Sequence, residues 1–77
     1  MIEPKIGDYA LINTPSVNEF YPIDIRGNVG KVVDIIKSFN YLYSLEMYKG
    51  VHKGAVFLFT RDMFTIISEK EATVRLI

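Results

Sequence analysis

Short apolar runs alternate with turn-forming residues along this chain, at intervals of about 8–15 residues that are typical of small all-β proteins. The runs are rich in Val, Ile, Tyr and Phe, whose branched or aromatic side chains favour pleated strands. Five runs predict strands at residues 9–12, 29–37, 41–48, 55–59 and 64–67. The pattern therefore predicts an all-β fold, a small five-stranded antiparallel barrel whose strands each turn one face to a shared core.

The segment Asp24–Ile35 carries the clearest turn signal of the chain. Gly27, Asn28 and Gly30 stand directly before a β-branched run. Glycine adopts positive φ without steric cost and asparagine tolerates it well, so we expect a tight turn that leads into a central strand. A helix over residues 30–43 is the alternative, because apolar residues also recur there at helical spacing. The density of β-branched residues and the missing helix cap favour the strand.

The C-terminal third supports two interpretations. Residues 60–63 predict a single 3-10 turn before the fifth strand. Ser68 and Glu71 have the spacing of a capping box, which would start a helix. Residues 73–77 are equally suited to a strand, because they contain Thr, Val and Ile. Of these two, we favour a terminal strand.

Length and charge restrict the class of protein. A chain of 77 residues is expected to form one domain over residues 1–77, with a small core. Nine basic and nine acidic residues cancel, whereas a protein that binds nucleic acid regardless of sequence needs an excess of Lys and Arg. A net charge near zero gives little protection against association, which suits a subunit of a larger complex.

The chain contains no cysteine, which excludes disulfides, a thiolate nucleophile and cysteine-based zinc or iron–sulfur ligation by this chain. Residues 1–5 lack the apolar core of a secretory signal. No apolar run approaches the roughly 20 residues that cross a bilayer. We therefore expect a soluble protein without a membrane span, located in the cytoplasm or the plastid stroma.

No constellation of catalytic residues is visible, so the sequence predicts neither an enzyme nor a cofactor or metal site. His52 is the single histidine and lies in a turn-rich loop. The aspartates are dispersed, and we expect Asp24 and Asp62 to brace turns by Asx-type hydrogen bonds. Residues 27–31 resemble a phosphate-binding loop only superficially, because no Ser or Thr and no helix follow the lysine.

Aromatic residues are the best candidates for contact with a partner. Five tyrosines and five phenylalanines exceed what one small core needs, and aromatic rings are enriched at protein interfaces. The long loop at residues 16–26 is itself apolar, so it either presents a binding patch or closes one end of the barrel. The candidate partner-binding residues are Phe20, Tyr21, Tyr41, Tyr43, Tyr48 and Phe59.

The order of these signals resembles the SH3-like barrel class, with Gly7-Asp8 at the first strand and a long first loop. Within that class, the chain most resembles the variable, non-catalytic chain of ferredoxin–thioredoxin reductase. The resemblance rests on the apolar–Asp–apolar–x–Gly–x–x–Gly–x–Val segment at residues 23–32. The chain departs from that family near its C-terminus, where Leu58 stands at the histidine position and Met63 at the acidic position.

This resemblance implies a chain without chemistry of its own, which binds and stabilises a larger redox protein that carries an iron–sulfur cluster and a redox disulfide. The alternative is a KOW-like barrel regulator, encoded by a phage or a plastid, because residues 30–35 also resemble that barrel core. Such a regulator would bind nucleic acid, or a transcription, translation or defence protein. Aromatic rings beside basic side chains would then stack bases. The lysines in question are Lys31, Lys37, Lys49 and Lys53.

Overall fold

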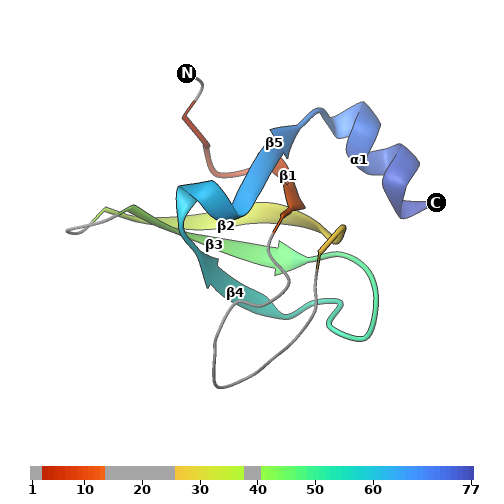
Figure 1. Ribbon diagram of the computed structural model, residues 1–77, viewed down its shortest axis with the longest axis horizontal. Helices are drawn as coiled ribbons and strands as arrows, with labels where there is room; N and C mark the ends of the chain where they lie inside the picture. The colour runs from red at the N-terminus through yellow and green to blue at the C-terminus, as the bar shows by residue number, and fades with distance from the viewer. Residues whose placement is uncertain (1–2, 14–25, 38–40) are drawn as a thin grey trace.

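The computed structural model describes residues 3–13, 26–37 and 41–77, which form an antiparallel sheet of five strands and a C-terminal helix (Figure 1). The strands are β1 (Tyr9–Ile12), β2 (Val29–Lys37), β3 (Tyr41–Met47), β4 (Val56–Phe59) and β5 (Phe64–Ile67). The 3-10 turn η1 (Arg61–Met63) joins β4 to β5, and α1 (Glu69–Leu76) follows β5. The predicted five-stranded antiparallel fold and its 3-10 turn are therefore confirmed, and the helical alternative for β2 is wrong.

The strand order β4-β3-β2-β1-β5 places the two chain-adjacent strands β4 and β5 at opposite edges of the sheet. The sheet nevertheless curls, which is seen from a contact between its two edge strands. Phe64 of β5 contacts Phe59 of β4 with ring centroids 6.4 Å apart. Phe64 also meets Tyr43 of β3 at 5.4 Å, edge to face. Contacts between residues from both edges of the order show that the sheet folds around a common interior.

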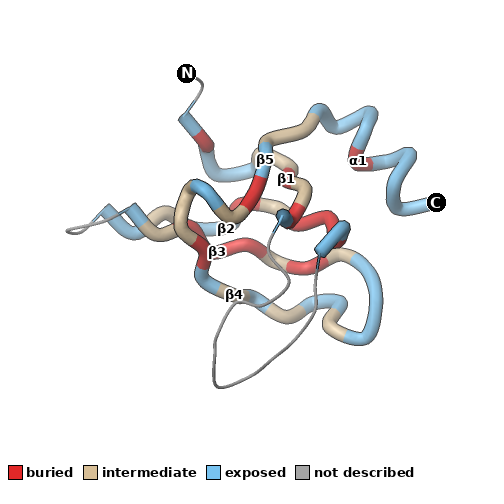
Figure 2. Tube along the Cα trace, viewed as in Figure 1, coloured by how far each residue is buried: buried red, intermediate tan, exposed pale blue. Residues whose placement is uncertain are grey.

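The core lies inside this curl, where the inward-facing residues of all five strands meet (Figure 2). In β3 the alternation is clear, because Tyr43, Leu45 and Met47 are all buried. Full burial of such side chains contributes about 1.5–3 kcal/mol each, which a domain of this size needs for stability. The buried cluster consists of Ala10, Ile12, Val32, Tyr43, Leu45, Met47, Phe59 and Phe64.

The glycine-rich turn before β2 differs from the prediction in one residue. Gly27 has a φ of 81° and donates its N–H to the carbonyl of Ile12 at 3.0 Å, so it forms the expected turn. Gly30, which we also assigned to the turn, lies within β2 opposite Met47. A Cβ at Gly30 would lie 3.0 Å from the Met47 Cε. This glycine is therefore explained by close packing against β3 and not by a positive φ.

Asn28 is buried between these glycines and connects the turn to Lys49 by a hydrogen bond. Its side-chain Nδ2 donates to the carbonyl oxygen of Lys49 at 2.9 Å, just beyond the end of β3. No residue other than glycine has a positive φ in the described ranges, so Asn28 acts through its amide and not through an unusual backbone. The predicted structural role of Asn28 is thus supported by a hydrogen bond that closes the β1–β2 turn onto β3.

The C-terminal segment is a helix, so the terminal strand that we favoured is wrong. Ser68 accepts a hydrogen bond from the Glu71 backbone N–H at 3.1 Å, as the capping-box spacing predicted. The single cap satisfies one of the otherwise unpaired N–H groups of the first turn. Ala72 is buried and Lys49 donates to the carbonyl of Arg75 at 3.3 Å, which holds α1 beside the sheet. The β-branched residues of this segment do not make it a strand, because the edge of the sheet beside β1 is already occupied by β5.

Candidate functional site

Potential catalytic groups do not converge in the described part of the chain. No group of three or more His, Cys, Asp or Glu residues lies together there in an arrangement that could hold a metal ion. His52 is half-buried and packs edge to face on Phe57, with ring centroids 6.0 Å apart. This contact gives the His52 imidazole a packing role beside the β3–β4 turn.

Two of the aspartates brace turns. Asp8 accepts a hydrogen bond from the Lys5 backbone N–H at 2.9 Å, and its own N–H donates to the Lys5 carbonyl at 3.0 Å. Asp62 accepts a hydrogen bond from the Thr60 hydroxyl at the start of η1. This bond, with a further backbone hydrogen bond, lowers the pKa of Asp62. The expected bracing role is thus seen at Asp62, whereas Asp24 lies outside the described residues.

Two of the aromatic candidates are core residues. Tyr43 and Phe59 are 3% and 1% exposed, and they pair with each other across β3 and β4. Burial raises the pKa of the Tyr43 hydroxyl, and the negative charge of Glu3 raises it further. We expected both rings to be exposed for contact with a partner, but the curl of the sheet turns both of them inward.

The remaining aromatic candidates have different surroundings. Tyr41 is exposed at the start of β3. Tyr48 is half-buried and meets Tyr9 edge to face, with centroids 6.0 Å apart. Phe20 and Tyr21 lie outside the described residues. Tyr41 and Tyr48 thus remain surface candidates, and they lie at opposite ends of β3.

An apolar surface lies on the outer side of the sheet, where four side chains of β2, β3 and β4 share one face. Cross-strand register pairs Ile36 with Leu42. It also places Leu58 opposite Ser44, and Val56 opposite Glu46. Residues two apart in a strand share a face, so these apolar side chains lie on the same side as Ser44 and opposite the core. We call Ile36, Leu42, Val56 and Leu58 the outer apolar face.

Three members of this face are substantially exposed, namely Ile36, Val56 at 54% and Leu58 at 49%. Charged side chains of both signs accompany them, because Asp34, Glu46 and Lys31, which lies opposite Glu46, occupy the same side of the sheet. Our sequence reasoning missed these residues because it ranked aromatic rings and left aliphatic ones aside. The available signal was the strand period: within Val56–Phe59, alternate residues must face solvent once the other two are assigned to the core.

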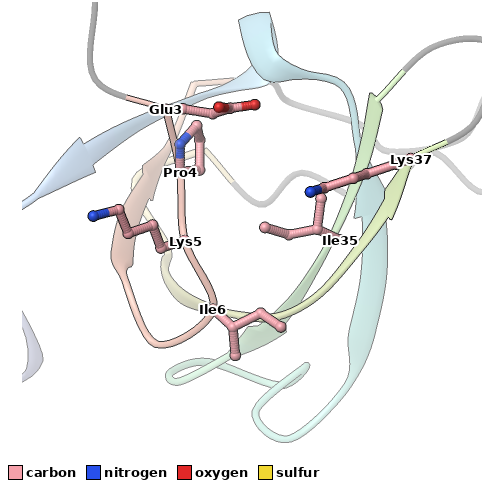
Figure 3. A pocket seen from close by; sticks show the side chains of 6 residues that line it. All are labelled: Glu3, Pro4, Lys5, Ile6, Ile35 and Lys37. Carbon is pink, nitrogen blue, oxygen red and sulfur yellow. The ribbon is translucent and has the colours of Figure 1, made fainter.

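A groove lies on a different part of the molecule, between the N-terminal segment and the end of β2 (Figure 3). It has a volume of about 390 Å³, which is near the lower end of the range for ligand sites. Figure 3 shows the Ile35 and Lys37 side chains pointing into the opening from β2, with Glu3 across from them. The lining residues are Glu3, Pro4, Lys5, Ile6, Ile35 and Lys37, and we call this site the N-terminal groove.

Comparison with models of known protein families, with curated proteins and with solved structures finds no match to this chain. Within the residues that the structure describes, no helix has the length and apolar character needed to cross a membrane. Two surfaces of the described residues are thus candidate binding sites, namely the outer apolar face and the N-terminal groove.

Proposed function

We propose that this chain is a non-catalytic accessory subunit that binds and stabilises a larger partner protein through its outer apolar face. The observation that carries the proposal is the position of this face. Its aliphatic side chains lie in adjacent register on the side of the sheet that faces away from the core. A contiguous apolar surface with a polar surround is typical of a protein–protein contact.

The charge beside this face specifies the surface of the partner. Asp34 is exposed and Glu46 is half-buried, and both lie on the side that carries the apolar residues. Lys31 lies opposite Glu46 on this side, so a complementary partner presents an apolar centre with a basic side chain opposite Asp34, since opposite potentials across an interface favour association. We propose a larger redox protein in this role, on the resemblance of residues 23–32 to the variable chain of ferredoxin–thioredoxin reductase. The cytoplasm or the plastid stroma would be the compartment.

Affinity capture with matched variants tests this proposal. The tagged chain is expressed in its native host, and material captured under gentle lysis is compared for the unmodified chain, Leu58→Lys and Val51→Lys. Val51 is 94% exposed in the β3–β4 turn, outside the outer apolar face, so its variant controls for the added charge. We expect one larger protein with the visible absorption of an iron–sulfur cluster, retained by Val51→Lys and reduced at least about tenfold by Leu58→Lys.

Three results would contradict the proposal or a part of it. A lone monomer under gentle lysis would contradict the role of an accessory subunit. Equal capture of the partner by Leu58→Lys would move the interface away from the outer apolar face. Capture of a partner without an iron–sulfur cluster would retain the accessory role and reject the redox assignment.

A KOW-like nucleic-acid binder is the second candidate, and one cluster favours it. The Lys31 ammonium lies 5.6 Å from the centroid of the Tyr9 ring, and that ring meets Tyr48 edge to face. Proteins that bind single-stranded nucleic acid place basic groups beside aromatic rings, because the rings stack on bases and the basic groups contact the phosphates. Retention on single-stranded DNA and RNA at about 50 and 200 mM salt discriminates the two functions. Salt-sensitive retention that Lys31→Glu abolishes would favour this candidate.

A further inference from the structure

Strand β2 extends well beyond the strand that pairs with it on one side. β1 pairs with β2 only from Val29 to Lys31. Val32 adds two backbone hydrogen bonds to the segment before β1. Its N–H donates to the Asp8 carbonyl at 2.9 Å, and its carbonyl accepts from the Gly7 N–H at 2.8 Å. Among the described residues, no strand pairs with residues 33–37 on the side opposite β3. Within residues 3–13, 26–37 and 41–77, the second half of β2 is therefore a free sheet edge.

The hydrogen bonding of Ile35 shows which backbone groups face this edge. Its N–H donates to the Asp34 Oδ1 at 2.9 Å, although Ile35 lies opposite Tyr43 in the ladder with β3. In an antiparallel pair, residues alternate between bonding their partner strand and pointing away from it. Ile35 and Lys37 thus direct their backbone groups to the free edge, where a carboxylate of the same strand occupies one donor.

The N-terminal groove lies beside this free edge. Residues 3–6 would continue alongside β2 if the β1 ladder ran straight, but the chain turns at Gly7, which has a φ of 98°. A backbone hydrogen bond from Asp8 to Lys5 closes this turn. The turn separates residues 3–6 from the end of β2 and leaves the groove between them (Figure 3). Two chain segments thus border a space that runs along unpaired backbone groups.

The side chains of the groove combine an apolar surface with two lysines, Lys5 and Lys37, and one acidic residue, Glu3, so the lining carries a net positive charge. Pro4 is buried, Ile6 is exposed and Ile35 is half-buried against the core. Lys37 is exposed, and no described residue forms an ion pair with it. Ile35 and Lys37 lie two residues apart on the same side of β2, so they present an apolar and a cationic site at one strand repeat.

We propose that the N-terminal groove binds an extended segment of a protein partner, which adds as a strand to residues 33–37 of β2. The added strand is antiparallel, because that ladder continues the pairing of the sheet and is slightly more stable per residue. Its acidic side chain lies opposite Lys37, and an apolar side chain two residues later lies over Ile35. The recognised pattern is therefore acidic–x–apolar in an extended chain, and strand addition supplies the backbone hydrogen bonds.

The shape of the groove favours a polypeptide over a small molecule. Sites for small ligands bury about 70–90% of the ligand surface. Here four of the lining residues are exposed, namely Glu3, Lys5, Ile6 and Lys37. An extended chain needs less enclosure, because its affinity comes from repeated backbone hydrogen bonds along an edge. The lining of the groove shares no residue with the outer apolar face, although Ile36 of that face lies between Ile35 and Lys37, so variants of Leu58 and Lys37 test the two sites separately.

Nuclear magnetic resonance of the full-length chain tests the proposal with synthetic peptides. The probe is acetyl-Thr-Glu-Thr-Val-Thr-Ser-amide, added to the ¹⁵N-labelled protein up to about 1 mM. We expect amide shifts confined to residues 3–8 and 32–37. The same peptide with N-methyl groups at alternate residues cannot form the ladder, so we expect binding about tenfold weaker.

A charge exchange tests the side-chain register. Lys37→Glu should weaken binding of the Glu-containing peptide about fivefold, and a peptide with Lys in place of Glu should restore it. Lys53→Glu is the matched control, because Lys53 is exposed in the β3–β4 turn, and it should leave the affinity unchanged. The dispersion of the amide spectrum reports that each variant is folded.

Three outcomes would overturn the proposal. Shifts that are absent, or that map to Leu42, Val56 and Leu58 and not to residues 3–8 and 32–37, would reject the groove as a peptide site. Equal affinity for the N-methylated peptide would reject strand addition. Shifts in residues 33–37 that grow with protein concentration, without peptide, would identify a second copy of this chain as the occupant.

Discussion

Residues 29–32 and 33–37 belong to the same strand, yet the first four are buried or half-buried and the last five are mostly exposed. Both halves contain β-branched side chains, so composition does not explain the difference. The first half is paired with β1 and β3, whereas the second half is paired with β3 alone. Burial along β2 therefore follows the number of neighbouring segments and not the type of side chain.

A register shift marks the border between the halves. Val32 pairs with Leu45 and Asp34 with Ser44, so Val33 is an extra residue in the ladder. Such a bulge bends the strand and increases its twist locally. The bend coincides with the end of the β1 ladder and with the start of the free edge. One irregular residue thus separates a core segment from a segment available for binding.

The adjacent valines at this border provide the largest expected contrast. Val32 is fully buried in the core, whereas Val33 is 39% exposed. Val32→Ala should lower the free energy of unfolding by about 2 kcal/mol, because it removes buried methyl groups and leaves a cavity. Val33→Ala should change it by less than about 0.5 kcal/mol. Urea denaturation of both variants measures this, and equal losses would show that the two halves are buried alike.

Gly30 tests how closely the first half packs on β3. Gly30→Ala should cost about 1–2 kcal/mol, because the new Cβ lies 3.0 Å from the Met47 Cε and overfills the core. The cost should fall in the background of Met47→Ala, since the obstructing methyl group is then absent. Denaturation of the two single variants and the double variant gives the coupling, and strict additivity would contradict a contact with Met47.

Tyr43 lies opposite Ile35 and provides a pH test of the inner side of the second half. Its raised pKa means that the folded state keeps the proton more tightly than the unfolded state. The contribution of Tyr43 to the free energy of unfolding is thus fully present below pH 10, the ordinary pKa of tyrosine. It is lost as the pH rises through the pKa that Tyr43 has in the folded state. Tyr43→Phe should reduce this alkaline loss. A stability profile above pH 9 checks it, with Tyr41→Phe as the control, and equal losses in both would contradict burial of Tyr43 as the cause.

Asp34 should have the smallest effect on global stability and a clear local one. Asp34→Ala removes the acceptor of the Ile35 N–H, so the Ile35 amide should exchange with solvent faster. The free energy of unfolding should change by less than about 0.5 kcal/mol, because this aspartate is exposed. Hydrogen exchange followed by nuclear magnetic resonance compares Ile35 with Ile36, whose pairing with β3 should keep its rate unchanged. A slow Ile35 amide in the variant would mean that another group covers the free edge.

Much of the fold was predictable from local pattern. The β-branched and aromatic runs predicted the five strands, because these side chains suit a half-buried pleated surface. Gly27 marked its turn, since its positive φ is a property of the residue itself. Ser68 and Glu71 marked the start of α1, although we favoured a strand there. That choice was wrong because strand propensity does not indicate whether a sheet edge is available for pairing.

The candidate surfaces were much less predictable. Aromatic content suggested exposed rings, but Tyr43 and Phe59 fill the interior, because the curl of the sheet brings β3, β4 and β5 together. The outer apolar face depends on cross-strand register, which joins residues from three strands. The N-terminal groove depends on where the β1 ladder ends. Neither can be seen in any single segment.

The local conformations of this protein can be derived from its amino-acid sequence: which residues extend, where glycine permits a turn and where a helix can be capped. These follow from sterics and hydrogen bonds within a few residues. The packing of the whole chain, in contrast, sets which face of each strand is buried and which strand edge stays unpaired among the described residues. Both depend on contacts between segments distant along the chain, and in β2 they separate one continuous run of similar residues into a core half and a half with a free edge.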